Sequence, residues 1–152
     1  MESSIKVVAT NRKASHEFFL LERIEAGISL QGTEIKSIRA GQISLAEAYV
    51  RVDGDEAWLE DAHIAPYEHA GIFNHEPRRP RRLLLHKKEI RRLWNQVRQK
   101  GVTIVPIRVY LKQGRAKVEI AVAKGKKLYD KRETIAKRDA QRDLDRSLHQ
   151  RD

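Results

Sequence analysis

The sequence predicts a mainly β protein, in which a small closed barrel carries helices on its outside and a basic C-terminal tail follows. Five or six short apolar runs are separated by turn residues, and this pattern favours a small barrel over an open sheet. One stretch, residues 86–101, changes to the apolar spacing of an amphipathic helix. Large apolar side chains become scarce after Leu128. We therefore expect a structured body over residues 1–123 and a tail over residues 124–152.

Charge and composition narrow the class of protein. The chain of 152 residues carries 31 Lys and Arg against 21 Asp and Glu, a net charge of +10 at pH 7. This surplus favours nucleic acid as a partner over a membrane, because no apolar run approaches the roughly 18 residues of a spanning helix. The absence of Cys excludes disulfides, zinc ribbons and thiol catalysis. The first residues lack a signal-peptide pattern, so we expect a cytoplasmic protein.

The first half of the chain is expected to hold a bent strand and a short helix. Residues 18–24 are aromatic and branched, which is typical of a strand, and the pattern resumes at residues 28–30. The interruption at Glu25-Ala-Gly27 predicts a bulge, since Gly inside a strand often marks one. Thr33 is the expected N-cap of a helix that ends at Gly41.

The next part is expected to form a hairpin, a loop and a helix. Residues 45–52 and 57–64 flank Asp53-Gly-Asp55, which is a strong hairpin signal. Residues 65–82 contain three Pro and one Gly, so they are expected to form a long loop with an extended end. The helix over residues 86–101 follows, and Gly101 ends it.

Two final strands, residues 102–111 and 116–123, flank the turn Gln113-Gly114. Pro106 has no N–H to donate, so its strand is expected to lie at an edge or to be bulged there. The second strand alternates, with one apolar face made by Val118, Ile120 and Val122. These short strands, with a bulge and helices between them, favour a barrel of the OB type.

The tail, from Lys124 onward, carries ten Lys and Arg against six Asp and Glu. Such a segment buries too little surface to offset the entropy of ordering itself, roughly 1–2 kcal/mol per residue, so we expect it to be disordered when free. Apolar residues from Ile135 to Leu148 nevertheless recur at helical spacing, which predicts a helix on a partner that supplies contacts. A solvated charged terminus without a role is the alternative.

The most concentrated basic run suggests contact with RNA. Eight Lys and Arg face only Glu89 between residues 78 and 92, and the run includes Arg79 and Arg81. A basic helix surface behind a Pro-stiffened arm is suited to a ridge of phosphates; a solvated face is the alternative. A second, less specific cluster of hydrogen-bonding and charged side chains comprises Asn11, Arg12, Lys13 and His16.

Metal sites and enzymes find little support in the sequence. His63, His69 and His75 are spaced by six residues, which fits neither one helix face nor a usual zinc pattern. No phosphate-binding loop, nucleophile elbow or dinucleotide turn occurs, and the carboxylates do not converge as a two-metal nuclease requires. Trp58 and Trp94 are interpreted as core residues rather than as platforms for stacked bases.

Taken together, these residues closely resemble the family of SsrA-binding proteins, also called small protein B. The resemblance covers residues 11–132 in the family's order, so it is far more specific than a shared basic tail. The matching blocks are Asn11-Arg-Lys-Ala-Ser-His-Glu17, Glu25-Ala-Gly27, Leu30-Gln-Gly-Thr-Glu-Ile-Lys-Ser-Ile-Arg39, Asn74-His-Glu-Pro77, Arg81-Arg-Leu-Leu-Leu-His86 and Ala123-Lys-Gly-Lys-Lys-Leu-Tyr-Asp-Lys-Arg132.

The resemblance implies an OB-fold barrel with outer helices and a tail that is unstructured until it meets the ribosome. It also implies binding to the tRNA-like domain of transfer-messenger RNA and delivery of that RNA to stalled ribosomes in trans-translation. On the ribosome, the tail would contact the 16S rRNA of the small subunit at the decoding centre and extend as a helix along the empty mRNA channel.

Individual residues can be carried over by their position in the matching blocks. Glu25, Leu84 and His86 match the family's contacts with the elbow of the tRNA-like domain, and the cluster Asn11, Arg12, Lys13 and His16 is expected to border the same surface. The residues that match the tail signature near the decoding centre are Gly125, Lys126, Lys127, Tyr129, Asp130, Lys131 and Arg132.

The sequence therefore predicts a non-enzymatic RNA-binding adaptor of ribosome rescue, with no cofactor, no metal and no small-molecule ligand. One alternative is a generic basic OB-fold protein, either ribosomal or specific for single-stranded RNA, which would not prefer the tRNA-like domain over other RNA. The other alternative is an RNA-processing nuclease, whose cleavage would depend on a divalent metal.

Overall fold

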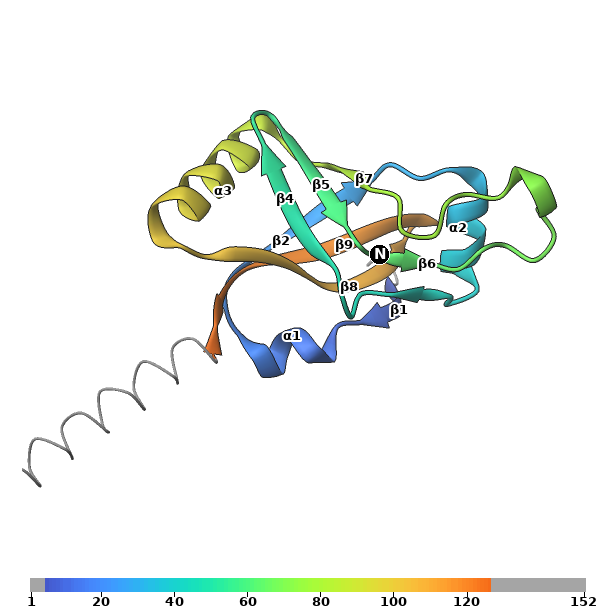
Figure 1. Cartoon of the computed structure of the whole chain (residues 1–152), viewed down its shortest axis with the longest axis horizontal. Coiled ribbons are helices and arrows are strands. Elements are labelled where there is room, and N and C mark those ends of the chain that lie inside the picture. The colour runs from blue at the N-terminus through green and yellow to red at the C-terminus, as the bar shows by residue number, and fades with distance from the viewer. Residues whose placement is uncertain (1–4, 127–152) are drawn as a thin grey trace, which may run out of the picture.

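The structure, a computed structural model, describes residues 5–126, and these form a mainly β body with helices outside the sheet (Figure 1). In chain order, its elements are β1 (Ile5–Thr10), α1 (Arg12–Glu17), β2 (Phe18–Ile28), α2 (Gly32–Arg39), β3 (Ile43–Ser44), β4 (Tyr49–Asp53), β5 (Glu56–Glu60), β6 (His63–Ile64), the 3₁₀ turn η1 (Gly71–Phe73), β7 (Arg81–Leu84), α3 (Lys87–Lys100), β8 (Thr103–Lys112) and β9 (Arg115–Gly125).

The main sheet closes on itself, as the expected barrel requires. Its strand order is β1-β8-β4-β5-β7-β2-β9, and an additional pairing joins β8 to β9. The pairings β8–β4–β5–β7–β2–β9–β8 therefore form a ring of antiparallel strands, with β1 as an extra strand on β8. The link between β4 and β8 is narrow, a single pair of Val50 with Ile104.

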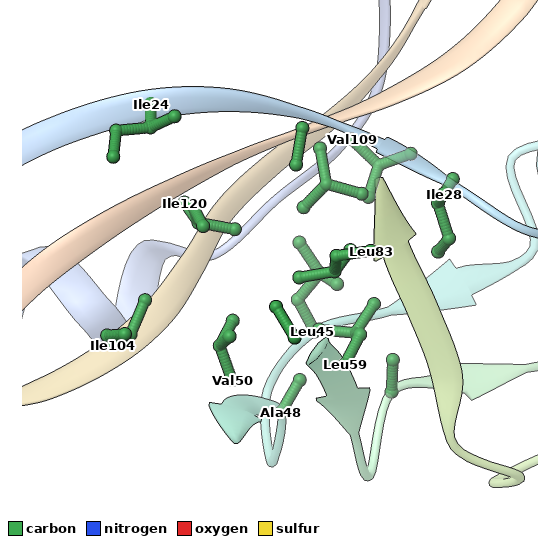
Figure 2. Packing of buried hydrophobic residues seen from close by; sticks show 14 of the residues in the cluster. Ile24, Ile28, Leu45, Ala48, Val50, Leu59, Leu83, Ile104, Val109 and Ile120 are labelled. Atoms are coloured by element: carbon green, nitrogen blue, oxygen red, sulfur yellow. The ribbon is translucent and has the colours of Figure 1, made fainter. Parts of the chain in front are cut away.

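The core fills the inside of this ring (Figure 2). Inward-facing residues from every strand of the ring meet there, because successive side chains of a strand point to opposite faces. Val118, Ile120 and Val122 face this core, so the expected alternation of the last strand is confirmed. The other face of the same strand is also buried at Ala121 and Ala123, which form a second apolar cluster with Ala14 of α1.

Most of the predicted elements are confirmed. β4 and β5 form the expected hairpin around Gly54, and β8 and β9 pair around Gln113-Gly114, where both residues have positive φ. The predicted helices correspond to α2 and α3, and Gly101 ends α3 in the left-handed conformation. The register of β8 shifts between Pro106 and Arg108, which is the bulge that Pro106 predicted.

Some details of the prediction are wrong. β2 runs without a break through Glu25-Ala-Gly27, and its bulge lies earlier, between Leu20 and Glu22 in the pairing with β9. The first turn of α2 begins at Gly32 rather than behind a Thr33 cap. Helix α1 and strand β1 were not predicted, although Asn11 marks the start of α1 by accepting a hydrogen bond from the backbone N of Ala14 at 3.1 Å.

A buried group of charges joins α2 to β7. The carboxylate of Glu34 is fully buried and accepts hydrogen bonds from Arg81 Nε at 2.6 Å and from Arg79 Nε at 3.1 Å. Arg81 is also fully buried, and it donates to the backbone oxygens of Ala62 and Pro77 at 2.7 and 3.0 Å. Burial raises the pKa of Glu34, but the hydrogen bonds from Arg79, the Gln31 backbone and Arg81 outweigh it, so the pKa is lowered.

We predict that Glu34→Ala lowers the free energy of unfolding by about 3–5 kcal/mol, because it leaves a buried guanidinium without its counter-ion. Thermal and urea unfolding of the purified protein measure this loss. In the wild-type protein the stabilisation by Glu34 is present above its ordinary pKa of 4.5 and is lost as the pH falls through its lowered pKa. Glu47→Ala is the control, because within residues 5–126 the ion pair of Glu47 is an exposed one, with Lys13 at 3.7 Å. Equal, small losses in both variants would contradict the assignment.

Candidate nucleic-acid interface

A groove of about 500 Å³ lies where the end of β2 meets β7 and the start of α3. Glu25, Leu84 and His86, which come from separate blocks of the sequence, all line this groove. Lys117 of β9 lines it as well, and a neighbouring hollow of about 360 Å³ shares Leu84 and Lys117 with it. The structure thus brings together three of the nine residues predicted for the tRNA-like domain, the three that the family resemblance placed at its elbow.

The groove is shaped by a close approach of two strands. Gly27 of β2 pairs with Leu84 of β7, and a Cβ atom added at Gly27 would lie only 3.1 Å from the Cβ of Leu84. Leu83 fills the core, so the alternation of the strand turns Leu84 outward, where its side chain is 55% exposed. An exposed Leu at this position offers an apolar surface to a base or a ribose.

His86 is the N-cap residue of α3, and its ring is exposed at the edge of the groove. Its backbone N donates a hydrogen bond to Glu89 Oε1 at 3.0 Å, which fixes the first turn of the helix. The exposed Lys87 lines the groove at this helix end, which carries a partial positive charge. The start of α3 is therefore suited to a phosphate group.

Glu25 is held on the outer face of the barrel by groups from β8. Its Oε2 accepts a hydrogen bond from the Tyr110 hydroxyl and lies 3.5 Å from Lys112 Nζ. The Tyr110 hydrogen bond is the main cause that lowers the pKa of Glu25; burial opposes it, and Lys112 and Lys117 add to it. Glu25 is therefore a carboxylate at neutral pH.

The strand register places Glu119 of β9 directly opposite Glu25, a pairing of like charges that is unfavourable by itself. Two arginines compensate for it. Arg23 Nη1 lies 3.3 Å from Glu119 Oε1, and Arg108 Nη2 lies 3.1 Å from Glu119 Oε2. The outer face of β2, β8 and β9 is thus a layer of paired charges beside the groove.

Two arginines of the basic run do not have the exposure that the sequence suggested. Arg81 is fully buried against Glu34, so the prediction that it contacts RNA is wrong. Arg79 is only partly exposed, and its guanidinium is already occupied. Nε and Nη2 bind the carboxylate of Glu34, and Nη1 donates to the backbone oxygen of Pro80. The sequence pattern could not separate these arginines from their neighbours, whereas the structure leaves Arg78 and Arg82 exposed.

The predicted cluster at residues 11–16 also lies away from the groove. Asn11 is buried, and its side-chain N donates to the backbone oxygens of Pro106 and Leu45 at 2.9 and 3.2 Å, so its side chain is not free for RNA. Arg12, Lys13 and His16 are exposed on α1. They precede β2, whereas the groove lies at its end, roughly 30 Å of extended strand away. They do not border the groove.

Helix α1 instead contacts the first residues of the predicted tail. Gly125 and Lys126 are called the root of the tail below. Lys126 Nζ donates a hydrogen bond to the backbone oxygen of Ser15 at 3.0 Å and lies 5.3 Å from the centre of the Phe19 ring. Gly125 ends β9 at the same place. The predicted tail residues Lys127, Tyr129, Asp130, Lys131 and Arg132 lie outside the described residues, as does the predicted helix beyond them.

Sequence reasoning missed several residues of the interface. Tyr110, Lys112 and Lys117 carried no motif, and only the pairing of β9 with both β8 and β2 brings them to Glu25. The two tryptophans are only partly buried, so their interpretation as core residues is wrong: Arg51 lies 5.9 Å from the ring of Trp58, and Arg98 lies 5.5 Å from the ring of Trp94.

Within residues 5–126, no group of three or more His, Asp or Glu side chains is placed to hold a metal ion. None of the helices in the part of the chain that the structure describes is long and apolar enough to span a membrane. The fold and the groove define a basic, mainly β protein with a surface of RNA-binding character.

Comparison with known proteins identifies the group to which this protein belongs. The family model "SmpB protein" matches residues 8–150. A protein of Desulforudis audaxviator named SsrA-binding protein is 58% identical over 93% of this chain and 93% of its own length. One of Roseiflexus, with the same name, is 60% identical over 96% of this chain and 93% of its own length. The chain belongs to the SmpB family.

A solved structure agrees with this assignment. It is described as "tmRNA-SmpB: a journey to the center of the bacterial ribosome", and its chain is 48% identical to this one. The two folds superpose with a TM-score of 0.66, over 78% of this chain and 83% of the solved chain.

We predict that Gly27→Ala weakens RNA binding and changes stability little. The added methyl group must displace Leu84 by a few tenths of an ångström, because 3.1 Å is tighter than nearly all contacts of this kind. Gly27 does not have a positive φ, so Ala introduces no backbone strain.

Titration of RNA against the wild-type and Gly27→Ala proteins, together with thermal unfolding, measures the effect. Gly114→Ala is unsuitable as a control because Gly114 has a positive φ; Gly32→Ala, at a site with nothing within 4 Å, is the matched control. Unchanged affinity for Gly27→Ala would show that RNA does not contact the groove at Leu84.

Proposed function

We propose that this protein binds the tRNA-like domain of transfer-messenger RNA through the groove and delivers that RNA to stalled ribosomes for trans-translation. Membership of the SmpB family supports this function, as do relatives named SsrA-binding protein and a similar solved chain described as "tmRNA-SmpB". The observation that carries the proposal for the site is the convergence of Glu25, Leu84 and His86 on one exposed groove.

The chemistry of the groove matches the way in which structured RNA is recognised. Proteins read such RNA through its shape, its phosphates, its 2′-hydroxyl groups and its unpaired bases. The Glu25 carboxylate repels phosphate and accepts hydrogen bonds, so its partner is an N–H group of a base or a ribose hydroxyl. Leu84 contacts a base or ribose face, and His86 with the helix end behind it takes a phosphate.

The second basic region serves the ribosome in this proposal. Arg12, Lys13 and His16 lie on α1, where Lys126 fixes the root of the tail. The tail signature that starts at Gly125 would therefore leave the body beside α1, at the opposite end of β2 from the groove. A protein with two separate RNA surfaces can hold transfer-messenger RNA with one and contact 16S rRNA at the decoding centre with the other.

This function makes the protein a cytoplasmic adaptor rather than an enzyme, because its work is to bring two RNA partners together. The name SsrA-binding protein of the relatives and the description "tmRNA-SmpB" of the solved structure support that assignment. A generic basic RNA-binding protein remains the second candidate, since the same net charge of +10 attracts any RNA. Preference for the tRNA-like domain over bulk tRNA at physiological salt distinguishes the two.

We predict that Glu25→Ala and His86→Ala each weaken binding to transfer-messenger RNA, by about tenfold for Glu25, which is the value of one hydrogen bond to a charged group. Both side chains are exposed, so circular dichroism should show an intact fold for each variant; Glu25→Ala should also lower the melting temperature slightly, because it removes the acceptor of the buried Tyr110 hydroxyl. Filter binding or fluorescence anisotropy in the presence of bulk tRNA measures the affinity. Glu68→Ala removes an exposed carboxylate outside the groove and is the control. If both variants bind like the wild-type protein, the assigned face is wrong.

We predict that the full-length triple variant Asp130→Ala, Lys131→Ala, Arg132→Ala binds transfer-messenger RNA normally but fails to support tagging of nascent chains on stalled ribosomes. These residues lie outside the described body and belong to the tail signature. The matched control replaces Arg142, Asp143 and Arg146 with Ala, which removes the same net charge of +1 from the tail. A reconstituted tagging assay compares the two. Equal tagging by both variants would mean that the tail acts as bulk charge, without a specific signature.

A further inference from the structure

Tyr110 occupies an unusual position for a buried side chain. It lies on β8, and its hydroxyl reaches Glu25 on the outer face of the barrel, yet the residue is only 2% exposed. Charged side chains cover it there: Arg108 lies 5.1 Å from the centre of its ring, and Lys117 is its partner in the strand register. A phenol enclosed by charges needs a hydrogen-bond partner, and the carboxylate of Glu25 is that partner.

We propose that Tyr110 is a positioning residue for RNA recognition, which holds the Glu25 carboxylate in one orientation so that its second oxygen, Oε1, accepts a hydrogen bond from an N–H or O–H donor of the RNA. This inference rests on the proposed function, because it assumes that Glu25 contacts RNA. It adds the residue that orients the Glu25 carboxylate towards a hydrogen-bond donor of the RNA.

The geometry gives Tyr110 a role that Lys112 cannot fill. The aromatic ring has few rotatable bonds and is packed between strands, so its hydroxyl is a fixed point, whereas a Lys side chain has four rotatable bonds. Both contacts of Glu25, from the Tyr110 hydroxyl and from Lys112 Nζ at 3.5 Å, fall on Oε2. Within the described residues no hydrogen bond involves Oε1, which leaves that atom for an external donor.

The charges around the pair keep Glu25 ionised. Lys112 approaches from β8 and Lys117 from β9, while Glu119 of β9 is neutralised by Arg23 and Arg108. The hydrogen bond from Tyr110 is the largest cause that lowers the pKa of Glu25, and the same bond, after burial, raises the pKa of Tyr110. The phenol thus remains a donor, and the carboxylate an acceptor, throughout the neutral range.

Tyr110→Phe tests this inference because it removes the hydroxyl and keeps the ring. The expected result is a loss of affinity for transfer-messenger RNA of about three- to tenfold, the range of one hydrogen bond. The same substitution in a Glu25→Ala background should cause no further loss, since Tyr110 acts only through Glu25. Tyr67→Phe is the control, because within the described residues the Tyr67 hydroxyl makes no hydrogen bond with another side chain or the backbone. Thermal unfolding of every variant accompanies the titrations.

The dependence on pH provides a readout that a purely structural role would not change. Without the phenol, the pKa of Glu25 returns towards its ordinary value of 4.5, so a larger fraction of the carboxyl is protonated at low pH. Tyr110→Phe should therefore lose more affinity than the wild-type protein when the pH falls from about 7.5 to about 5.

The outcomes separate this inference from the proposed function. If Glu25→Ala itself leaves affinity unchanged, the RNA face is misassigned, and both fail. If Glu25→Ala weakens binding while Tyr110→Phe does not, the RNA face is retained and the positioning role is overturned. Equal losses from Tyr110→Phe in the wild-type and Glu25→Ala backgrounds also overturn it, because the effect would then bypass Glu25.

Discussion

The buried ion pair of Glu34 with Arg81 is the constraint on which the proposed RNA surface depends. It ties α2 to the first residue of β7, and Arg79 adds a second bond from the preceding segment. A charge this deep is tolerated only when its partners satisfy it completely, and the backbone oxygens around Arg81 complete that set. Because β7 carries Leu84 and leads directly to His86, the ion pair fixes one wall of the groove although it never meets RNA.

The opposite wall follows from the pairing of β2 with β9, which pairs in turn with β8. This register sets Glu25 against Glu119, an arrangement that two arginines and one tyrosine stabilise. It also separates the groove from α1 and the tail root by the length of β2. A barrel strand therefore separates the two RNA surfaces proposed above, which is the geometry that an adaptor between transfer-messenger RNA and a ribosome requires.

Local patterns were enough to predict part of this structure. The hairpin at Gly54, the end of α3 at Gly101 and the bulge at Pro106 each follow from one residue type in its immediate context. Roles that depend on distant neighbours could not be read in the same way. Arg81 looked like a phosphate ligand because its counter-ion, Glu34, lies 47 residues earlier in the chain. Glu25 was identified through family resemblance, but its partner Tyr110, 85 residues away, appears only when the strands pair.

We propose that RNA binds at the groove between β2, β7 and α3. Amide chemical-shift mapping of the full chain, titrated with the isolated tRNA-like domain, locates the RNA surface residue by residue. We expect the largest shifts on Gly27, Leu84, His86 and Lys117, while residues 71–73 are unaffected. Large shifts confined to α1 or to residues 71–73, with none in the groove, would contradict it.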